Sequence, residues 1–202
     1  FKGPGTDLRV GILENSVWVG GSETSSRGGR FVANLPTFEV YTSPDYRATE
    51  GRVALTKPLI LHESLGPIPR GAWFEFEKGK VVRFGAEEGE ETLEMLFKID
   101  DRNRYLGEVA LVDAQTPIAK SDITFYNGLY DENAACHIAL GQASSMTYNG
   151  GSGMNDAQLL EAGLNGAKSH EDMMIGSEKM DVSAFLRDGG TMDLISNGTF
   201  VL

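Results

Sequence analysis

The sequence has 202 residues, of which 41% are hydrophobic and 23% are charged, enough for one well-cored domain or two small ones. Its 18 Lys and Arg against 29 Asp and Glu give a net charge of −11, which argues against nucleic-acid binding. No segment approaches the ~18 uninterrupted apolar residues that a membrane span requires. The single cysteine excludes an intramolecular disulfide and fits a reducing compartment, so we expect a cytoplasmic protein.

The first eighty or so residues are rich in glycine and poor in helical periodicity, which predicts strands joined by turns. Within 72–77, Phe74 and Phe76 share one face by the two-residue period of a strand. The Lys-Gly pair at 78–79 then predicts a tight hairpin. Strands are expected at 8–13, 17–19, 52–56, 72–77 and 80–84, and later at 107–112 and 172–175.

Three segments predict helices, the first with acidic residues near its N-terminus and Leu93, Leu96 and Phe97 on one stripe. The helices are expected at 86–99, at 133–140 (after an Asp131 N-cap and ending at Gly141), and at 156–162 (between Asn155 and Gly163). These elements, without a linker or repeat, indicate an α+β fold: residues 1–202 form a single domain with a mainly antiparallel or mixed sheet and about three helices. The opening Phe1–Thr6 reads like the middle of a longer chain, so we expect a piece of a larger protein.

The candidates for chemistry begin with His170 and Asp172, which open an apolar strand and point to the same face, while Glu171 points away. An imidazole beside a carboxylate on a rigid strand suits a divalent metal ion. The alternative interpretation is a strand end with solvated polar residues. Spacing alone leaves both interpretations open.

Three further residues are awkward to explain as plain structure: Glu39, Glu108 and His137 each have apolar neighbours. A buried carboxylate must be paired, hydrogen-bonded or bound to a metal, although each of these could also lie in water at a strand edge. His137 could equally be a core histidine that bonds a carbonyl. Cys136 beside it is interpreted as packing, and His62 with its neighbour Glu63 as part of a surface loop.

Together these segments resemble the thermophilic-type dinuclear metalloaminopeptidases, the family of aminopeptidase T, aminopeptidase S and PepS. The similarity covers nearly the whole chain but only the C-terminal half of a family member, so we expect the N-terminal α/β half to be absent from this sequence. The similar stretches include 3–8, 34–40, 54–59, 104–112, 125–127, 131–141 and 170–177.

The resemblance implies a site with two divalent metal ions (zinc, cobalt or manganese). By position, the family's ligands fall on Glu39, Glu108, His137, His170 and Asp172, with Glu39 and Glu108 as catalytic residues. Five side chains are few for two ions, so one carboxylate would bridge, and the sequence does not say which. The implied reaction is removal of the N-terminal residue from peptides with a free N-terminus by metal-activated water. The resemblance also implies a homodimer.

The sequence departs from the family at two positions. The family usually has a Tyr seven residues after the first histidine ligand, where this chain has Ser144; Tyr148 is a candidate substitute. The family also commonly shows two consecutive Glu where this chain has Phe38 and Glu39, and we assign the ligand to Glu39. Two alternatives follow: a non-catalytic metal- or peptide-binding module, and a glycosidase that uses Glu39 and Glu108 as its carboxylate pair.

Overall fold

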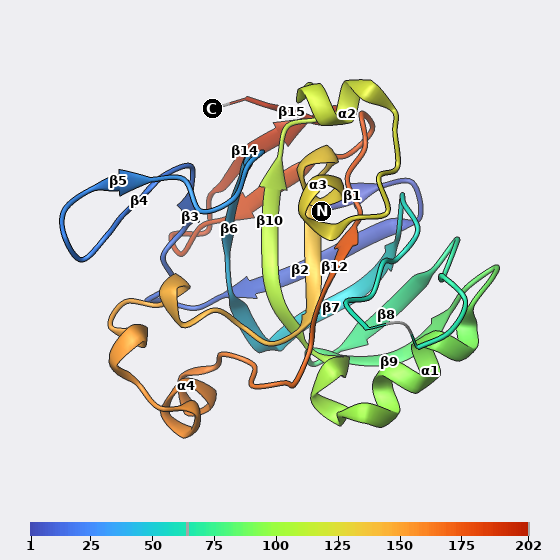
Figure 1. Cartoon of the computed structure of the whole chain (residues 1–202), viewed down its shortest axis with the longest axis horizontal. Coiled ribbons are helices and arrows are strands. Elements are labelled where there is room, and N and C mark those ends of the chain that lie inside the picture. The colour runs from blue at the N-terminus through green and yellow to red at the C-terminus, as the bar shows by residue number, and fades with distance from the viewer. Residues whose placement is uncertain (64, 202) are drawn as a thin grey trace.

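The computed structural model describes residues 1–63 and 65–201 (Figure 1). It contains two five-stranded antiparallel sheets, and alternating hydrophobic residues bury one face of each sheet. The first sheet has the order β1 (Lys2–Gly3), β2 (Thr6–Ile12), β7 (Pro44–Ala54), β8 (Trp73–Glu77) and β9 (Lys80–Gly85). The second has the order β12 (His170–Met174), β11 (His137–Gly141), β10 (Leu106–Val112), β6 (Glu39–Thr42) and β3 (Val19–Gly20).

Two smaller sheets complete the strands of the described residues. One contains β13 (Val182–Phe185), β14 (Thr191–Ser196) and β15 (Thr199–Phe200), and the other is the hairpin of β4 (Glu23–Thr24) and β5 (Arg30–Phe31), which projects to one side in Figure 1. The helices are α1 (Glu90–Ile99), α2 (Pro117–Ser121), α3 (Gly128–Asp131) and α4 (Asp156–Ala162). Short 3₁₀ turns are η1 (Asp101–Arg104), η2 (Glu132–Ala134), η3 (Ser145–Thr147) and η4 (Gly151–Gly153).

The main hydrophobic core lies between the two large sheets and α1. Phe74 and Phe76 of β8 are buried there, as the predicted two-residue period requires, together with Leu93 of α1. The second sheet contributes Ile138 of β11 and Met173 of β12. Because side chains alternate along a strand, residues 137, 139, 170 and 172 point away from this core.

The fold class is confirmed: the chain is α+β, with antiparallel sheets and few helices. The third predicted helix agrees with α4, whose Asn155 and Gln158 form a capping box and whose C-cap Gly163 is left-handed. The first predicted helix starts later than expected, because Gly89 has a left-handed backbone (φ 73°) and α1 begins only at Glu90. The residues before it pair with Arg70 instead.

The predicted helix at 133–140 is wrong. Residues 132–134 form the turn η2, and His137–Gly141 form the strand β11 between β10 and β12. Asp131 is not its N-cap; its carboxylate accepts the backbone N–H groups of Phe125 and Asn127. Every residue of β11 is buried, so pairing on both sides overrides the local helix signal.

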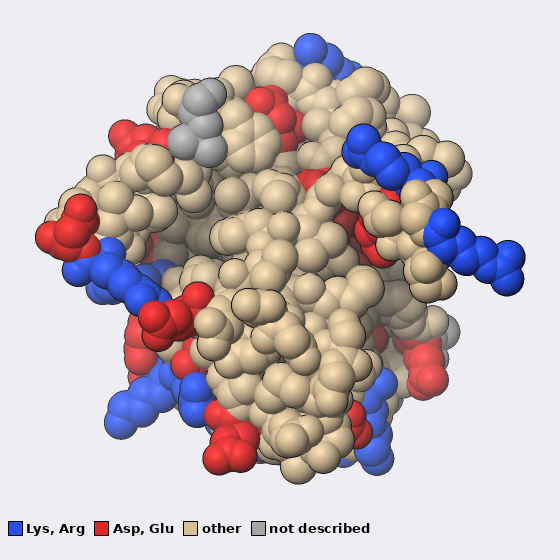
Figure 2. Space-filling model, turned by 90° about the vertical axis from the view of Figure 1, so that its left-hand side faces the viewer, with Lys and Arg blue, Asp and Glu red and all other residues tan. Residues whose placement is uncertain are grey.

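No helix of the described residues is long and apolar enough to cross a membrane. On the face shown in Figure 2, basic and acidic side chains are interspersed around a largely uncharged centre, without a continuous basic stripe.

Candidate metal centre

The five candidate ligands predicted from the sequence lie on one face of the second sheet, the face opposite the main core. The strand register explains this, because Glu108 of β10 pairs with Ala139 of β11, which in turn pairs with Asp172 of β12. One step along the same face, Gly141 pairs with His170. Ala139 is fully buried, and its single methyl group leaves room above the sheet between the flanking carboxylates.

His137 and Glu39 occupy the next positions on this face. Ala110 of β10 pairs with His137 on one side and with Tyr41 on the other, and Glu39 lies two residues before Tyr41 on β6. The two-residue period keeps Glu39 on the face of Tyr41. Four strands whose residues span positions 39 to 172 therefore deliver all five side chains to one place.

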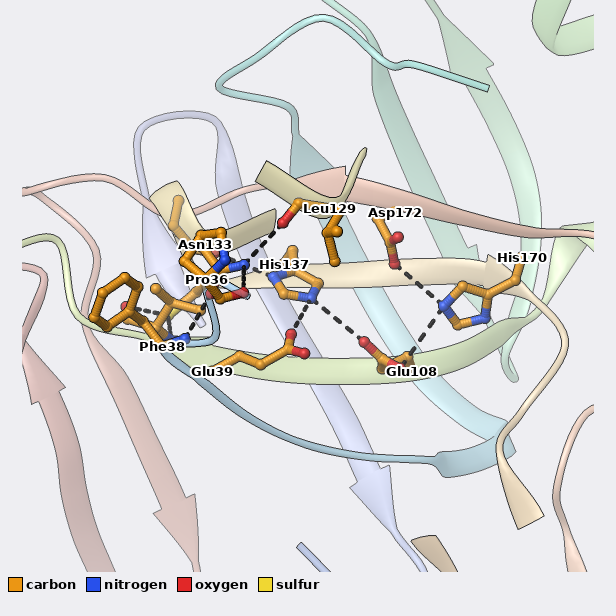
Figure 3. A network of polar contacts seen from close by, with 12 residues as sticks. Pro36, Phe38, Glu39, Glu108, Leu129, Asn133, His137, His170 and Asp172 are labelled. Atoms are coloured by element: carbon orange, nitrogen blue, oxygen red, sulfur yellow. Dashed lines mark hydrogen bonds and ion pairs between the residues drawn. The ribbon is translucent and has the colours of Figure 1, made fainter. Parts of the chain in front are cut away.

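The side chains form two clusters that share Glu108 (Figure 3). His137 Nε2 lies 3.1 Å from Glu39 Oε2 and 3.3 Å from Glu108 Oε1. His170 Nε2 lies 3.7 Å from Glu108 Oε2 and 3.2 Å from Asp172 Oδ1. Each oxygen of Glu108 thus faces a different imidazole, as a carboxylate that bridges two ions would.

Both imidazoles are held in one tautomer by the backbone. His137 Nδ1 lies 3.2 Å from the carbonyl oxygen of Ala135, and His170 Nδ1 lies 2.7 Å from that of Gln142. A carbonyl oxygen only accepts, so each Nδ1 carries a proton and donates it. This leaves both Nε2 atoms as the ligand atoms and fixes the ring planes, as in protein metal sites generally.

The surrounding carboxylates favour the protonated, positively charged form of both imidazoles in the metal-free chain. Burial opposes the charge of His137, but the contacts with Glu108 and Glu39 outweigh it and raise its pKa well above the ordinary value. Burial likewise opposes the charge of His170, but bonding to Asp172 raises its pKa to about 9. Burial raises the pKa of Glu108, whereas the contact with His170 overcomes burial and lowers that of Asp172.

The donor set fits two divalent ions. Glu39 Oε2 and His137 Nε2 are buried and form no hydrogen bond, although they face each other, so a cation between them would satisfy both. The mixture of carboxylate oxygens and imidazole nitrogens suits zinc, cobalt or manganese.

Asn133 lies in one of the stretches similar to the family, and the sequence alone predicts no role for it. In the structure this fully buried amide joins the segment before Glu39 to α3. Asn133 Oδ1 accepts the backbone N–H of Phe38 (2.6 Å), and its Nδ2 donates to the carbonyl oxygens of Pro36 (3.3 Å) and Leu129 (2.9 Å) (Figure 3). Asn133 thereby fixes the backbone from which Glu39 projects.

We expect Asn133→Ala to destabilise the fold by about 1–3 kcal/mol, because three hydrogen bonds of a buried amide are lost. It should also weaken binding of the ion nearest Glu39 by about 10–100-fold, as loss of an outer-shell partner does. Urea unfolding and competition with a chelator measure the two effects. The control Asn155→Ala removes the exposed cap of α4, so it should cost stability alone; unchanged metal affinity in Asn133→Ala would contradict the role.

The other residues singled out in the sequence lie around this centre or apart from it. Cys136 is buried and bonds the backbone of Val112, which agrees with packing. The His62 ring is exposed and contacts Glu171, which is buried on the opposite face. Ser144 and His170 line one cavity of about 320 Å³. The Tyr148 hydroxyl accepts a hydrogen bond from Asn15 (3.3 Å), a partner outside the ligand clusters.

Comparison with known proteins decides the family. The family model of thermophilic metalloproteases, M29, matches residues 1–200. The chain belongs to family M29. This confirms the resemblance found in the sequence, and it makes the chain a homologue of metalloaminopeptidases.

The M29 relatives include aminopeptidase T of Thermus aquaticus, 44% identical over 202 residues, a match that covers 100% of this chain and 48% of the relative. Aminopeptidase AmpS of Bacillus subtilis is 39% identical over 200 residues, which cover 99% of this chain and 48% of the relative. Wild-type AmpT from Thermus thermophilus superposes with a TM-score of 0.91 and 43% identity, over 100% of this chain and 49% of that structure. The M29 chain thus spans about half the length of the relatives it matches.

Proposed function

We propose that this chain forms the dinuclear metal centre of an aminopeptidase that releases N-terminal residues from peptides. The observation that carries the proposal is Glu108, whose two oxygens face the Nε2 atoms of two backbone-fixed imidazoles. Glu39, Glu108 and His137 would hold one ion, and Glu108, His170 and Asp172 the other. We assign the catalytic roles to Glu39 and Glu108 as well.

When bound, two divalent ions lower the pKa of a shared water and polarise the peptide carbonyl. The residues of the chain supply the geometry for this chemistry. Ala135 and Gln142 accept from Nδ1 of the two histidines and so direct each Nε2 toward the centre, where an ion would replace its proton. The burial of Glu108 and His137 limits competing water, which strengthens every charge interaction in the site.

The proposal extends to the domain, its ions, its substrates and its assembly. Residues 1–202 would act as one metal-binding catalytic domain, with zinc, cobalt or manganese as the ions and peptides with a free N-terminus as substrates. We also propose a cytoplasmic homodimer. Family membership argues against the glycosidase alternative, which leaves both imidazoles without a role.

Metal content tests the proposal directly. Elemental analysis after dialysis should find about two divalent ions per chain, falling clearly in His170→Ala. The loaded chain should hydrolyse an aminoacyl p-nitroanilide but not its N-acetylated counterpart. No bound metal in the unaltered chain would overturn the proposal that this chain alone forms the centre.

Ser144→Tyr separates an enzyme from a non-catalytic binding module. Position 144 lines a cavity with His170, so a phenol introduced there lies at the edge of the proposed centre. If the centre is competent, hydrolysis should rise by about tenfold or more, the range that one positioned acid–base group contributes. Steady-state kinetics measure the change, with Ser152→Tyr, at an exposed position outside that cavity, as the control. Metal binding without hydrolysis in Ser144→Tyr would favour the binding module.

A further inference from the structure

A tyrosine lies on the same face of the second sheet as the candidate ligands. Tyr41 of β6 pairs with Ala110 of β10, and Ala110 pairs on its other side with His137 of β11. Residues that pair directly place their side chains on the same face of a sheet, with Cβ atoms about 5 Å apart. Tyr41 and His137 therefore lie on either side of the single methyl group of Ala110.

The space above Ala110 is where the first cluster would hold its ion. Glu39 projects from β6 and reaches across β10, because its Oε2 lies 3.1 Å from Nε2 of His137 on β11. The fully buried methyl group of Ala110 forms the floor of this crossing. Glu108 reaches His137 from two residues along β10. Tyr41 thus borders the ion position on the side opposite His137.

The phenol of Tyr41 lies close to the carboxylates of the centre. Burial, and after it the negative charges of Glu108 and Glu39, raise the pKa of Tyr41 to about 12. Smaller contributions come from Glu23 and Glu132. The ordinary pKa of a tyrosine already keeps the phenol protonated at neutral pH, so its hydroxyl is a hydrogen-bond donor with or without this shift. The side chain is half-buried, which leaves part of it accessible to a bound molecule.

The chemistry of the centre indicates what such a donor could bind. Hydrolysis of a peptide moves negative charge onto the carbonyl oxygen of the substrate, and fixed donors aimed at that oxygen stabilise the transition state. The charged groups that most affect the pKa of His137 and of Asp172 are carboxylates and imidazoles. A phenol adds a donor to these surroundings without adding a positive charge that would repel the ions.

We infer that the Tyr41 hydroxyl donates a hydrogen bond to the carbonyl oxygen of the substrate's first residue as negative charge develops on it. The inference rests on the proposed function. Tyr41 is then a catalytic residue that contacts the substrate, whereas the five ligands contact the ions. Because the bond strengthens with the developing charge, its loss lowers kcat more than it raises KM.

The first experiment measures binding, with Tyr41→Phe to remove the hydroxyl and keep the ring. The probes are the phosphonic acid analogue of L-leucine, whose tetrahedral anionic group resembles the transition state, and isopentylamine, which lacks that group. Calorimetry on the zinc-loaded chain should show that Tyr41→Phe binds the phosphonate about tenfold more weakly or worse, the range of a hydrogen bond to a charged group. Binding of isopentylamine and the zinc content should not change.

The matched control is Tyr46→Phe. Tyr46 lies on β7 in the first sheet and packs edge-on against Tyr105, so loss of its hydroxyl should leave the binding of both probes unchanged. Steady-state hydrolysis of L-leucine p-nitroanilide is the second measurement. In Tyr41→Phe, kcat should fall by about 100-fold, the effect of removing one oxyanion donor, while KM stays nearly constant.

The outcomes separate this inference from the function on which it rests. A zinc-loaded Tyr41→Phe chain that keeps its affinity for the phosphonate overturns the donor role of Tyr41. A higher KM with unchanged kcat also overturns it, because the hydroxyl would then bind the substrate equally in the ground state. Loss of zinc in Tyr41→Phe shows that the hydroxyl supports the metal centre instead. An unaltered chain that binds no zinc overturns the proposed function itself.

Discussion

Glu108→Gln is expected to abolish the binding of both metal ions and to lower peptide hydrolysis by roughly three orders of magnitude or more. The reason is the geometry of one side chain: each oxygen of Glu108 faces a different imidazole, at 3.3 and 3.7 Å. A glutamine keeps the shape but offers one acceptor oxygen and no charge. Both ions would therefore lose a ligand, and the net positive charge of the centre would rise.

Glu108→Gln should lose more metal than a substitution of a ligand that belongs to only one cluster. Glu39 belongs to the first cluster alone and Asp172 to the second alone, so Glu39→Gln and Asp172→Asn should each retain about one ion. Elemental analysis of the three variants, with circular dichroism to verify folding, measures the pattern. The control is Glu171→Gln, on the opposite face of β12. Equal metal loss in all three ligand variants would contradict a shared Glu108.

Side-chain alternation was enough to predict the part of the candidate site that lies on β12. The sequence predicted that His170 and Asp172 open the apolar strand at 172–175 with both side chains on one face, and the structure has them on one face of β12 (His170–Met174). The hairpin at 78–79 and the buried faces of β8 followed from the same two-residue period. Local patterns are reliable where the strand carries both a polar and an apolar face.

The prediction of a helix at 133–140 was wrong because this segment has no contrast between a polar and an apolar face. Small and apolar residues surround His137, and Asp131 before them resembles an N-cap. A central strand buried on both faces has no alternation to reveal it. Gly141, which looked like a helix C-cap, ends a strand: its φ is 107°, and a Cβ there would lie 2.0 Å from the Ser169 carbonyl oxygen.

The contacts of Asn133 and the burial of Glu132 could not be predicted from the sequence, for a different reason. Asn133 acts on Phe38, 95 residues earlier in the chain, through a contact that only the tertiary fold creates. Glu132 in η2 stands out only in the fold, where its Oε1 is buried without a hydrogen-bond partner. The family resemblance assigned five ligands by position, whereas their shared face and the central place of Glu108 required the register of four strands.

Metal affinity should depend steeply on pH. In the metal-free chain both imidazoles hold an extra proton at pH 7, since the pKa of His137 is raised and that of His170 is about 9. Each ion must displace one proton from Nε2, so its apparent affinity should rise about tenfold per pH unit, up to about pH 9 for the ion at His170. Chelator competition at pH 6, 7 and 8, and proton release in two calorimetry buffers, measure this. Affinity that stays flat from pH 6 to 8 would contradict it.

The stability of the metal-free chain should change in the opposite direction. A raised histidine pKa stabilises the fold fully below the ordinary value of 6.5, and this contribution is lost as pH rises through about 9. Urea unfolding in the presence of a chelator should therefore show declining stability from pH 6.5 to 9, and His170→Ala should flatten that decline. With both ions bound, Nε2 no longer carries the proton, so the decline should disappear. A decline confined to the metal-free chain would show that protons and ions compete for the same two nitrogens, and an equal decline with metal bound would contradict it.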